Sequence, residues 1–332
     1  MILAQIDLTT GSIPKTLLRF AFPMICGNLL QQLYNVADTL IVGRFLGSDA
    51  LGAVGSSYTL MTFLTSILLG LCMGSGALFS VCWGQRDLAR LRRQTHAAFV
   101  LIAVCTVVLN AAAFLLLDAM KTLLSVPAEV WPLMRSYLFV IFFGIGGTFL
   151  YNYYASLLRA VGNSLVPLLF LAAAAVLNIA LDLVFVLVCR WGVEGAAAAT
   201  VLAQWLSGIG TAVYAIVRCP ELRARREERR ITGAMLRELL SASVLTCLQQ
   251  SVMNLGILMV QGRINSFGPV IMAAFAAAVK IDSFAYMPLQ DFGNAFSTFI
   301  AQNYGAQQPE RIRRGIRTAV LLSSVFAVCV SA

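Results

Sequence analysis

Long apolar runs follow one another along almost the whole chain, and they constrain the fold more than any other feature. A helix needs about 20 mainly apolar residues to cross a bilayer. An open chain crosses lipid only as helices, because the bilayer core offers no partners for backbone polar groups. Of 332 residues, 59% are hydrophobic and only 12% charged, whereas a soluble domain carries about 25% charged residues. We therefore expect an all-α polytopic membrane protein.

The apolar runs predict eight complete membrane-spanning helices and a ninth that reaches the end of the sequence. Several of them exceed the minimum length, which indicates tilt or extension beyond the bilayer. The predicted helices cover residues 13–43, 50–83, 95–117, 131–158, 164–188, 193–217, 234–261, 269–302 and 316–332.

Basic residues gather in alternate connections between these runs, most densely at 86–93, 218–230 and 311–317. Because lysine and arginine concentrate on the cytoplasmic side of a membrane, this set is expected to be cytoplasmic. The N-terminus is then cytoplasmic as well. The net charge of +9 is explained by topology, and no nucleic-acid-binding signature accompanies it.

Parts of the sequence recur about 220 residues apart. Asn35 and the pair Gly43–Arg44 match Asn254 and Gly262–Arg263, each at a spacing of 219 residues. Further on, GQRDLARLRR at 84–93 matches GAQQPERIRR at 305–314. Six predicted helices separate the copies. An even number keeps both copies in the same orientation, so the repeat is parallel.

The parallel repeat predicts a plan of six plus six helices in two halves, of which this chain holds about nine. Residues 1–217 form a complete six-helix N-terminal lobe, and residues 218–232 form a basic cytoplasmic linker. We expect this charged linker to be a solvated connection. Residues 233–332 form an incomplete C-terminal lobe of about three helices. The alternative is a protein of nine helices.

Asp38 and Asp182 are among the carboxylates that lie within the predicted helices. An ionisable side chain at the bilayer centre costs at least about 2.5–3.5 kcal/mol, so such residues usually face a cavity or a partner. Asn178 precedes Asp182 by four residues, which places both on one helix face. The alternative role for these groups is to join helices through hydrogen bonds.

Further oxygen ligands lie on two more predicted helices, where Tyr137, Asn152, Thr200 and the backbone carbonyl of Ala196 are available. Hard cations prefer oxygen ligands, and a carboxylate in low dielectric favours its protonated form. The oxygen set therefore predicts a site for Na⁺, H⁺ or either ion. The candidate Na⁺ ligands are Asp38, Asn178, Asp182 and Thr200.

Pro23 lies upstream of Asp38 in the first predicted helix, where it removes a backbone hydrogen bond and should bend the helix. The bend is either a switch that responds to Asp38 or a static kink. The position that matches Asp38 in the second half is Ile257. Polar residues elsewhere are candidates for a substrate cavity, with a structural ion pair as the alternative for Lys280: Gln31, Asn35, Gln250, Lys280, Asp282 and Asp291.

Four stretches together resemble the prokaryotic multidrug and toxic compound extrusion (MATE) transporters. They are QQLYNVADTLIVGRFLG at 31–47, LYNYYASLLRAVGNSLVP at 150–167, NIALDLVF with GVEGAAAATVLAQ within 178–204, and MPLQDFGNAFSTFIAQNYGA at 287–306. These stretches occur in the family's order and cover most of the chain.

The resemblance implies two six-helix lobes around a central cavity in the plasma membrane. It implies a monomer without a cofactor that exports organic, often cationic and lipophilic, compounds in exchange for H⁺ or Na⁺ by alternating access. The family's coupling aspartate carries over onto Asp38. Its cation network carries over onto Tyr137, Asn152, Asn178, Asp182 and Thr200, with Ala196 as a carbonyl ligand. Another branch has a glutamate in helix 7, where this chain has Gln249 and Gln250, so no ion site is expected there.

There are four alternatives to export. A lipid-linked oligosaccharide flippase of the same superfamily would place several cations in its cavity, whereas Lys280 is the single clear candidate here. An intramembrane enzyme is disfavoured, because the sequence holds no HExxH motif and no CxxC pair. A non-transporting ligand-binding protein would bind its ligand without any ion dependence. An inactive fragment is the remaining alternative.

Overall fold

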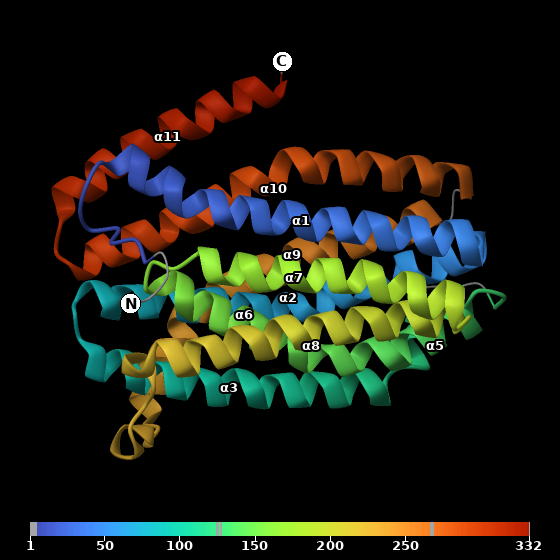
Figure 1. Cartoon of the computed structure of the whole chain (residues 1–332), viewed down its shortest axis with the longest axis horizontal. Coiled ribbons are helices and arrows are strands. Elements are labelled where there is room, and N and C mark those ends of the chain that lie inside the picture. Colours follow the sequence, from blue (N-terminus) through green and yellow to red (C-terminus); the bar gives the residue numbers. More distant parts are fainter. Residues whose placement is uncertain (1–4, 124–125, 127, 266–268, 332) are drawn as a thin grey trace.

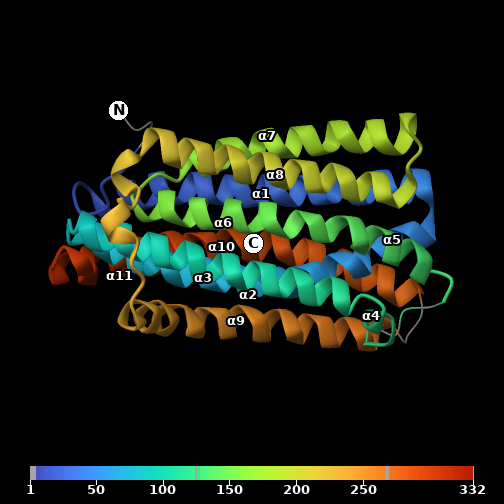
Figure 2. The ribbon, with the colours of Figure 1, turned by 90° about the horizontal axis from the view of Figure 1, so that it is seen from below.

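The computed structural model describes residues 5–123, 126, 128–265 and 269–331. In these residues the chain is built of helices and contains no strand, which confirms the all-α part of the expected fold. Figures 1 and 2 show long helices running side by side along the longest axis, with α11 diverging from the bundle. The long helices are α1 (Ile13–Leu46), α2 (Ser48–Gly84), α3 (Leu88–Leu115), α5 (Trp131–Ile141), α6 (Ile145–Ala160), α7 (Leu165–Asp182), α8 (Gly192–Arg218), α9 (Gly233–Asn265), α10 (Pro269–Gly305) and α11 (Pro309–Ser331); α4 (Ala119–Leu123) is short.

Five helical segments among the described residues are long and apolar enough to cross a membrane. They are Ser48–Gly84, Leu88–Leu115, Trp131–Ala160, Leu165–Val188 and Gly192–Arg218, and they correspond to the second to sixth expected spans. In α1, polar side chains such as Asn28, Gln31 and Asp38 interrupt the apolar sequence. The full count of nine spans, and the lobes built from them, stay predictions.

Two helices begin seven residues earlier than expected. Helix α3 starts at Leu88, because the carboxylate of Asp87 caps it by accepting from the Arg90 backbone N–H over 2.9 Å. Helix α11 starts at Pro309, a residue suited to the first helical position. Both basic clusters therefore belong to helices, whereas hydropathy alone placed them in loops.

The fourth expected span is interrupted by a short 3₁₀ segment at Phe142–Gly144, which separates α5 from α6. A tighter turn changes which backbone carbonyls have helical partners. Side chains from neighbouring helices bind two of them: Asn110 Nδ2 donates to the Phe142 carbonyl over 2.8 Å, and Trp205 Nε1 donates to the Phe143 carbonyl over 2.9 Å. The interruption is thus stabilised by α3 and α8.

The most extensive helix contact joins α2 with α9, which lie on opposite sides of the linker in sequence. Gly70 and Gly74 lie one turn apart on α2 and allow this close approach. A Cβ atom added at Gly70 would lie 2.4 Å from Cys247 Cα, and one at Gly74 would lie 2.4 Å from Ser243 Cα. Small residues four apart are a common means of close helix packing in membranes.

Residues 5–12 form an N-terminal strap that contacts both halves of the chain. Toward the first half, the Ile6 backbone N–H donates to the Gly162 carbonyl over 2.9 Å. Toward the second half, the Arg311 guanidinium donates to the carbonyls of Leu8, Thr10 and Gly11 over 2.6–3.3 Å. The strap is therefore fixed at the ends of α6 and α11.

Most charged side chains of the basic linker are exposed, as expected of a solvated connection, but the linker is also anchored on the bundle. Its residues Cys219 and Leu222 are buried in the core. Arg92 of α3 donates to both carboxylate oxygens of Glu228 over 2.8–3.0 Å. An arginine fork that binds both oxygens of a carboxylate fixes its partner in position, so the linker is tied to α3.

Candidate functional site

Helix α7 carries two deeply buried side chains of the predicted oxygen set. The side chains of Asn178 and Asp182 are 1% and 0% exposed. Directly after Asp182 the helix widens into a π-helical segment, Leu183–Val188. Such segments occur often at functional sites. The four-residue spacing did place both side chains on one face, and that face is turned into the protein.

Oxygen atoms without hydrogen-bond donors gather at this place. Asn178 Nδ2 donates to Thr200 Oγ1 of α8 over 3.3 Å. In the described part of the chain, Asn178 Oδ1 and both carboxylate oxygens of Asp182 have no hydrogen-bond partner. A buried polar atom that lacks a partner is costly and calls for an explanation, such as a bound ion, proton or water. These three oxygens therefore form a polar centre suited to a cation.

Asp38 comes to the same centre from α1, which packs against α7. Its charge acts on Asp182 and also on the Tyr137 hydroxyl of α5. Tyr137 is 5% exposed, and the charge of Asp182 also acts on its hydroxyl. Four helices, α1, α5, α7 and α8, thus contribute five of the predicted groups to this centre: Asp38, Tyr137, Asn178, Asp182 and Thr200.

Tyr34 is a member of this centre that sequence reasoning missed. It lies one turn before Asp38 on α1, and its hydroxyl interacts electrostatically with Asp38 and Tyr137. Gln31, a candidate for the substrate cavity, hydrogen-bonds to Tyr34. The sequence did contain a signal for Tyr34: it lies four residues before Asp38, and residues four apart share a helix face.

Two of the predicted ligands are poorly placed to bind a cation at this centre. Asn152 Nδ2 donates to the Thr148 carbonyl of its own helix over 2.9 Å. Ala196 is fully buried one turn before Thr200 inside α8, where helical hydrogen bonding already uses each backbone carbonyl. Among the described residues no three histidine, cysteine, aspartate or glutamate side chains gather into a metal site. The centre therefore offers carboxylate, amide and hydroxyl oxygens, which suit a hard monovalent cation or a proton.

Pro23 lies inside α1, which is one continuous helix in spite of it. Figure 1 shows α1 bending in its first part, near its N-terminal end. A proline removes one backbone hydrogen bond and favours a bend, and the role of Pro23 as the bending residue stays a prediction.

The candidates for the substrate cavity separate into different surroundings. Asn35 Nδ2 donates to Gln32 Oε1 on the same helix over 3.2 Å. Gln250 turns toward Met73 of α2, with 3.8 Å between Nε2 and the sulfur. Asp291 is 3% exposed and accepts from Asn28 of α1 over 2.5 Å. The side chains of Lys280 and Asp282 lie outside the described residues.

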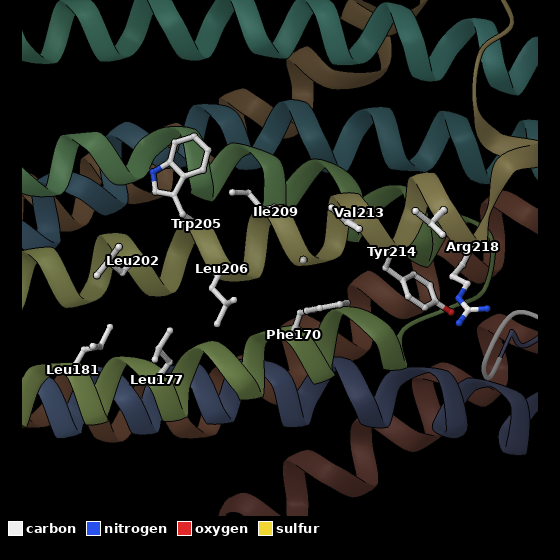
Figure 3. A pocket seen from close by; sticks show the side chains of 12 residues that line it. Phe170, Leu177, Leu181, Leu202, Trp205, Leu206, Ile209, Val213, Tyr214 and Arg218 are labelled. Carbon is white, nitrogen blue, oxygen red and sulfur yellow. The ribbon is translucent and has the colours of Figure 1, made fainter.

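An apolar groove of about 720 Å³ lies on another face of the bundle, between α7 and α8. Figure 3 shows Leu177 and Leu181 of α7 facing Leu202 and Leu206 of α8 across it. Leu177 and Leu181 directly precede Asn178 and Asp182 in sequence. Helix α7 therefore presents an apolar face to the groove and its polar pair to the protein interior.

Comparisons with known proteins agree with this architecture. The model of the MatE family matches residues 23–184 and 242–332. The probable multidrug resistance protein YpnP of Bacillus subtilis is 31% identical over 307 residues, which cover 92% of this chain and 68% of that protein. The probable multidrug resistance protein YoeA of the same organism is 27% identical over 322 residues, 95% of this chain and 70% of that protein.

Solved structures show the same fold. A MOP superfamily transporter from Pyrococcus furiosus aligns with a TM-score of 0.90 at 22% identity, covering 98% of this chain and 72% of that chain. The family points to transport of small molecules across the plasma membrane rather than to catalysis. The chain therefore belongs to the MatE family of multi-pass multidrug efflux transporters.

Proposed function

We propose that this protein is a secondary antiporter that exports organic, often cationic and lipophilic, compounds in exchange for H⁺ or Na⁺ bound among Asp38, Asn178, Asp182 and Thr200. The single observation that carries the proposal is the set of three buried oxygens on Asn178 and Asp182 without donors. They lie within electrostatic reach of a second carboxylate, Asp38. Asp182 is buried and Asp38 is partly buried. Two carboxylates in such surroundings that act on each other are poor structural partners, because like charges in low dielectric repel.

A cation at this centre would change how α1 packs on α7. With the site empty, the charges of Asp38 and Asp182 repel each other and favour separation of the two helices. A bound Na⁺ bridges both carboxylates, and a proton neutralises one of them, so either ion favours close packing. Because α1 also packs against α10 of the second half, a shift of α1 would reach both halves. A bend at Pro23 would give α1 a place at which to pivot.

The driving force for such exchange is ample. One elementary charge that moves across 100 mV supplies about 2.3 kcal/mol. We propose the orientation that follows from the basic residues, with the N-terminus cytoplasmic. We also propose the two lobes, 1–217 and 233–332, as the bodies that move around the central cavity. A monomer suffices for this mechanism.

The proposal is tested by titrating Na⁺ calorimetrically into the purified chain at several pH values. We expect saturable Na⁺ binding that weakens as protons compete, and loss of the binding heat in Asp38→Asn and in Asp182→Asn. Asp49→Asn is the matched control, because Asp49 is an exposed carboxylate at the start of α2.

The outcomes separate the coupling ions. Proton release without Na⁺ binding, lost in the same two variants, assigns the site to H⁺ alone. Ion binding that persists in both variants would contradict the assignment of Asp38 and Asp182. Export of a fluorescent lipophilic cation from reconstituted vesicles would then test the function itself, with loss of gradient-driven export expected in Asp38→Asn.

A further inference from the structure

A second buried carboxylate lies at a contact between the two halves of the chain. Asp291 of α10 is 3% exposed, and its Oδ1 atom accepts from Asn28 Nδ2 of α1 over 2.5 Å. Its Oδ2 atom has no hydrogen-bond partner in the described part of the chain. The Asn294 side chain, three residues further along α10, also acts on the carboxylate as a hydrogen-bond donor. Asp291 thus has neutral donors from α1 and from its own helix at a place where α1 and α10 meet.

The charge that faces Asp291 comes from α6. Arg159, in the last turn of α6, acts electrostatically on Asp291, and its Nε atom has no hydrogen-bond partner among the described residues. Tyr151 of α6 also interacts with both Arg159 and Asp291. Helix α1 presents the neutral Asn28, and no titratable group of α2, α9 or α11 in the described chain acts on Asp291. Asp291 and Arg159 thus attract each other without forming a direct salt bridge.

This centre is separate from the one around Asp38. Asn28 and Asp38 are ten residues apart on α1, which corresponds to about 15 Å along the helix. Charges so far apart influence each other weakly, and α1 is the element that connects them. An event at Asp291 would therefore reach Asp38 through the position of α1.

The surroundings of Asp291 suit a proton better than Na⁺. Asn28 presents its donor group to the carboxylate, so it supplies no ligand for a metal ion. Arg159 adds a positive charge nearby. A sodium ion needs several oxygen ligands, whereas a proton needs only the free Oδ2 atom and leaves the hydrogen bond from Asn28 to Oδ1 in place.

From these observations we propose that Asp291 is a second cation-binding residue of this transporter, one that takes up a proton and thereby changes the contact between α1 and α10. The inference rests on the proposed antiport function and adds a second ion-coupled group to it. Protonation neutralises Asp291 and leaves the Arg159 charge without its counter-charge. Arg159 is partly buried, so once its counter-charge is gone its guanidinium gains hydration by turning further toward water, and α6 and α10 shift relative to α1.

Infrared difference spectroscopy of the purified chain, recorded across an acid-to-alkaline titration, tests proton uptake directly. The C=O band of a protonated carboxyl should lose one component in Asp291→Asn and a different component in Asp38→Asn. In Asn28→Ala the Asp291 component should persist with a shifted frequency, because its hydrogen-bond donor is gone. A titration of Asp291→Asn that superimposes on the wild type overturns the proposal.

A distance measurement tests the coupling to the helices. Spin labels at the exposed positions Phe22 of α1 and Tyr304 of α10 should report a distance that changes with pH in the wild type and is constant in Asp291→Asn. Arg159→Gln, which keeps the carboxylate, should also abolish the change. The proposal is overturned if the distance between the labels in the wild type does not change with pH, or if the change persists in Asp291→Asn.

The two proposals fail independently of each other. Loss of the Asp291 band in Asp291→Asn, with Na⁺ and H⁺ binding unaffected in Asp38→Asn and Asp182→Asn, would retain the Asp291 site and reject the first centre. The reverse pattern would retain the first centre and reject the second.

Discussion

Asn178 of α7 donates a hydrogen bond to Thr200 of α8 over 3.3 Å, and this bond leaves the Asn178 carbonyl oxygen, like both carboxylate oxygens of Asp182 one turn later, without a hydrogen-bond partner among the described residues. The bond fixes which end of the amide faces the centre. If the amide reversed, its donor group would occupy the place proposed for a cation. Thr200 therefore orients an oxygen ligand in addition to offering its own hydroxyl.

Replacing Thr200 by valine, which has nearly the same shape, should weaken ion binding. The loss of one hydrogen bond is worth about 1 kcal/mol, which corresponds to a decrease of about fivefold in Na⁺ affinity by calorimetry. Thr211→Val is the matched control. Thr211 is fully buried in the same helix, but its hydroxyl donates to the Ser207 carbonyl over 2.6 Å. Equal affinities in the two variants would argue against Thr200 as part of the site.

Adding a methyl group at Gly74 should disrupt the contact between α2 and α9. The new Cβ would meet Ser243 Cα at 2.4 Å, in backbone that has little freedom to move. Overpacking of this kind costs about 1–3 kcal/mol, so Gly74→Ala should lower the thermal unfolding temperature of the detergent-solubilised protein. Gly55→Ala on the same helix has open space around its Cβ and should be neutral or slightly stabilising, by about 0.5–1 kcal/mol.

The linker contact should make stability depend on pH in the acid range. Hydrogen bonds from Arg92 lower the pKa of Glu228 below the ordinary glutamate value of 4.5. A lowered pKa means that the contribution is fully present above about pH 4.5 and is lost as the pH falls through the folded-state pKa. The pair lies near the surface, so it contributes about 0.5–1 kcal/mol.

Thermal unfolding across this pH range checks the contribution of Glu228. Glu228→Gln should unfold at a lower temperature than the wild type near neutral pH, and the two curves should converge in acid. Glu227 is exposed and makes no ion pair among the described residues, so Glu227→Gln should follow the wild type throughout. A difference for Glu228→Gln that is constant with pH would exclude the titration of this carboxylate as its cause.

The helices of this fold were largely readable from the sequence, because apolar runs in a bilayer have few alternatives to the helix. The start of α3 was missed, since Arg90, Arg92 and Arg93 lower the local hydropathy although Asp87 is a good helix cap. Gly70 and Gly74 were visible as a pair of small residues four apart. Their partner helix was not, because the sequence does not state which distant segment packs there.

Part of the site was predictable because a charged side chain is costly to bury, so a charged residue within an apolar run indicates a functional role. Asp38, Asn178 and Asp182 stood out as polar groups in apolar runs, and the structure brings Asp38 within reach of Asp182. Tyr34 was overlooked because a tyrosine within an apolar run is counted as an apolar residue. The partnership of Asn28 with Asp291 joins residues 263 positions apart, and only the packing of α1 on α10 reveals it.

The N-terminal strap should depend on Arg311 more than on any other single side chain. The Arg311 guanidinium donates to three backbone carbonyls of the strap and lies 5.6 Å from the centre of the Phe299 ring. Arg311→Gln removes the fork that reaches them, so amide hydrogens in residues 5–12 should exchange faster by mass spectrometry. Arg313→Gln is the control, because Arg313 is exposed and pairs with Glu310 of its own helix.

Other contacts of the strap limit how much its amide exchange can rise in Arg311→Gln. The Asn303 side-chain amide also donates to the Leu8 carbonyl over 3.1 Å, and Ile6 is held at Gly162, where an added Cβ would lie 2.1 Å from the Ile6 carbonyl oxygen. Arg311→Gln should therefore raise exchange most at residues 9–11 and least at Ile6. Uniform exchange along the whole segment would mean that Arg311 holds the strap alone, and unchanged exchange would mean that the Gly162 and Asn303 contacts suffice without it.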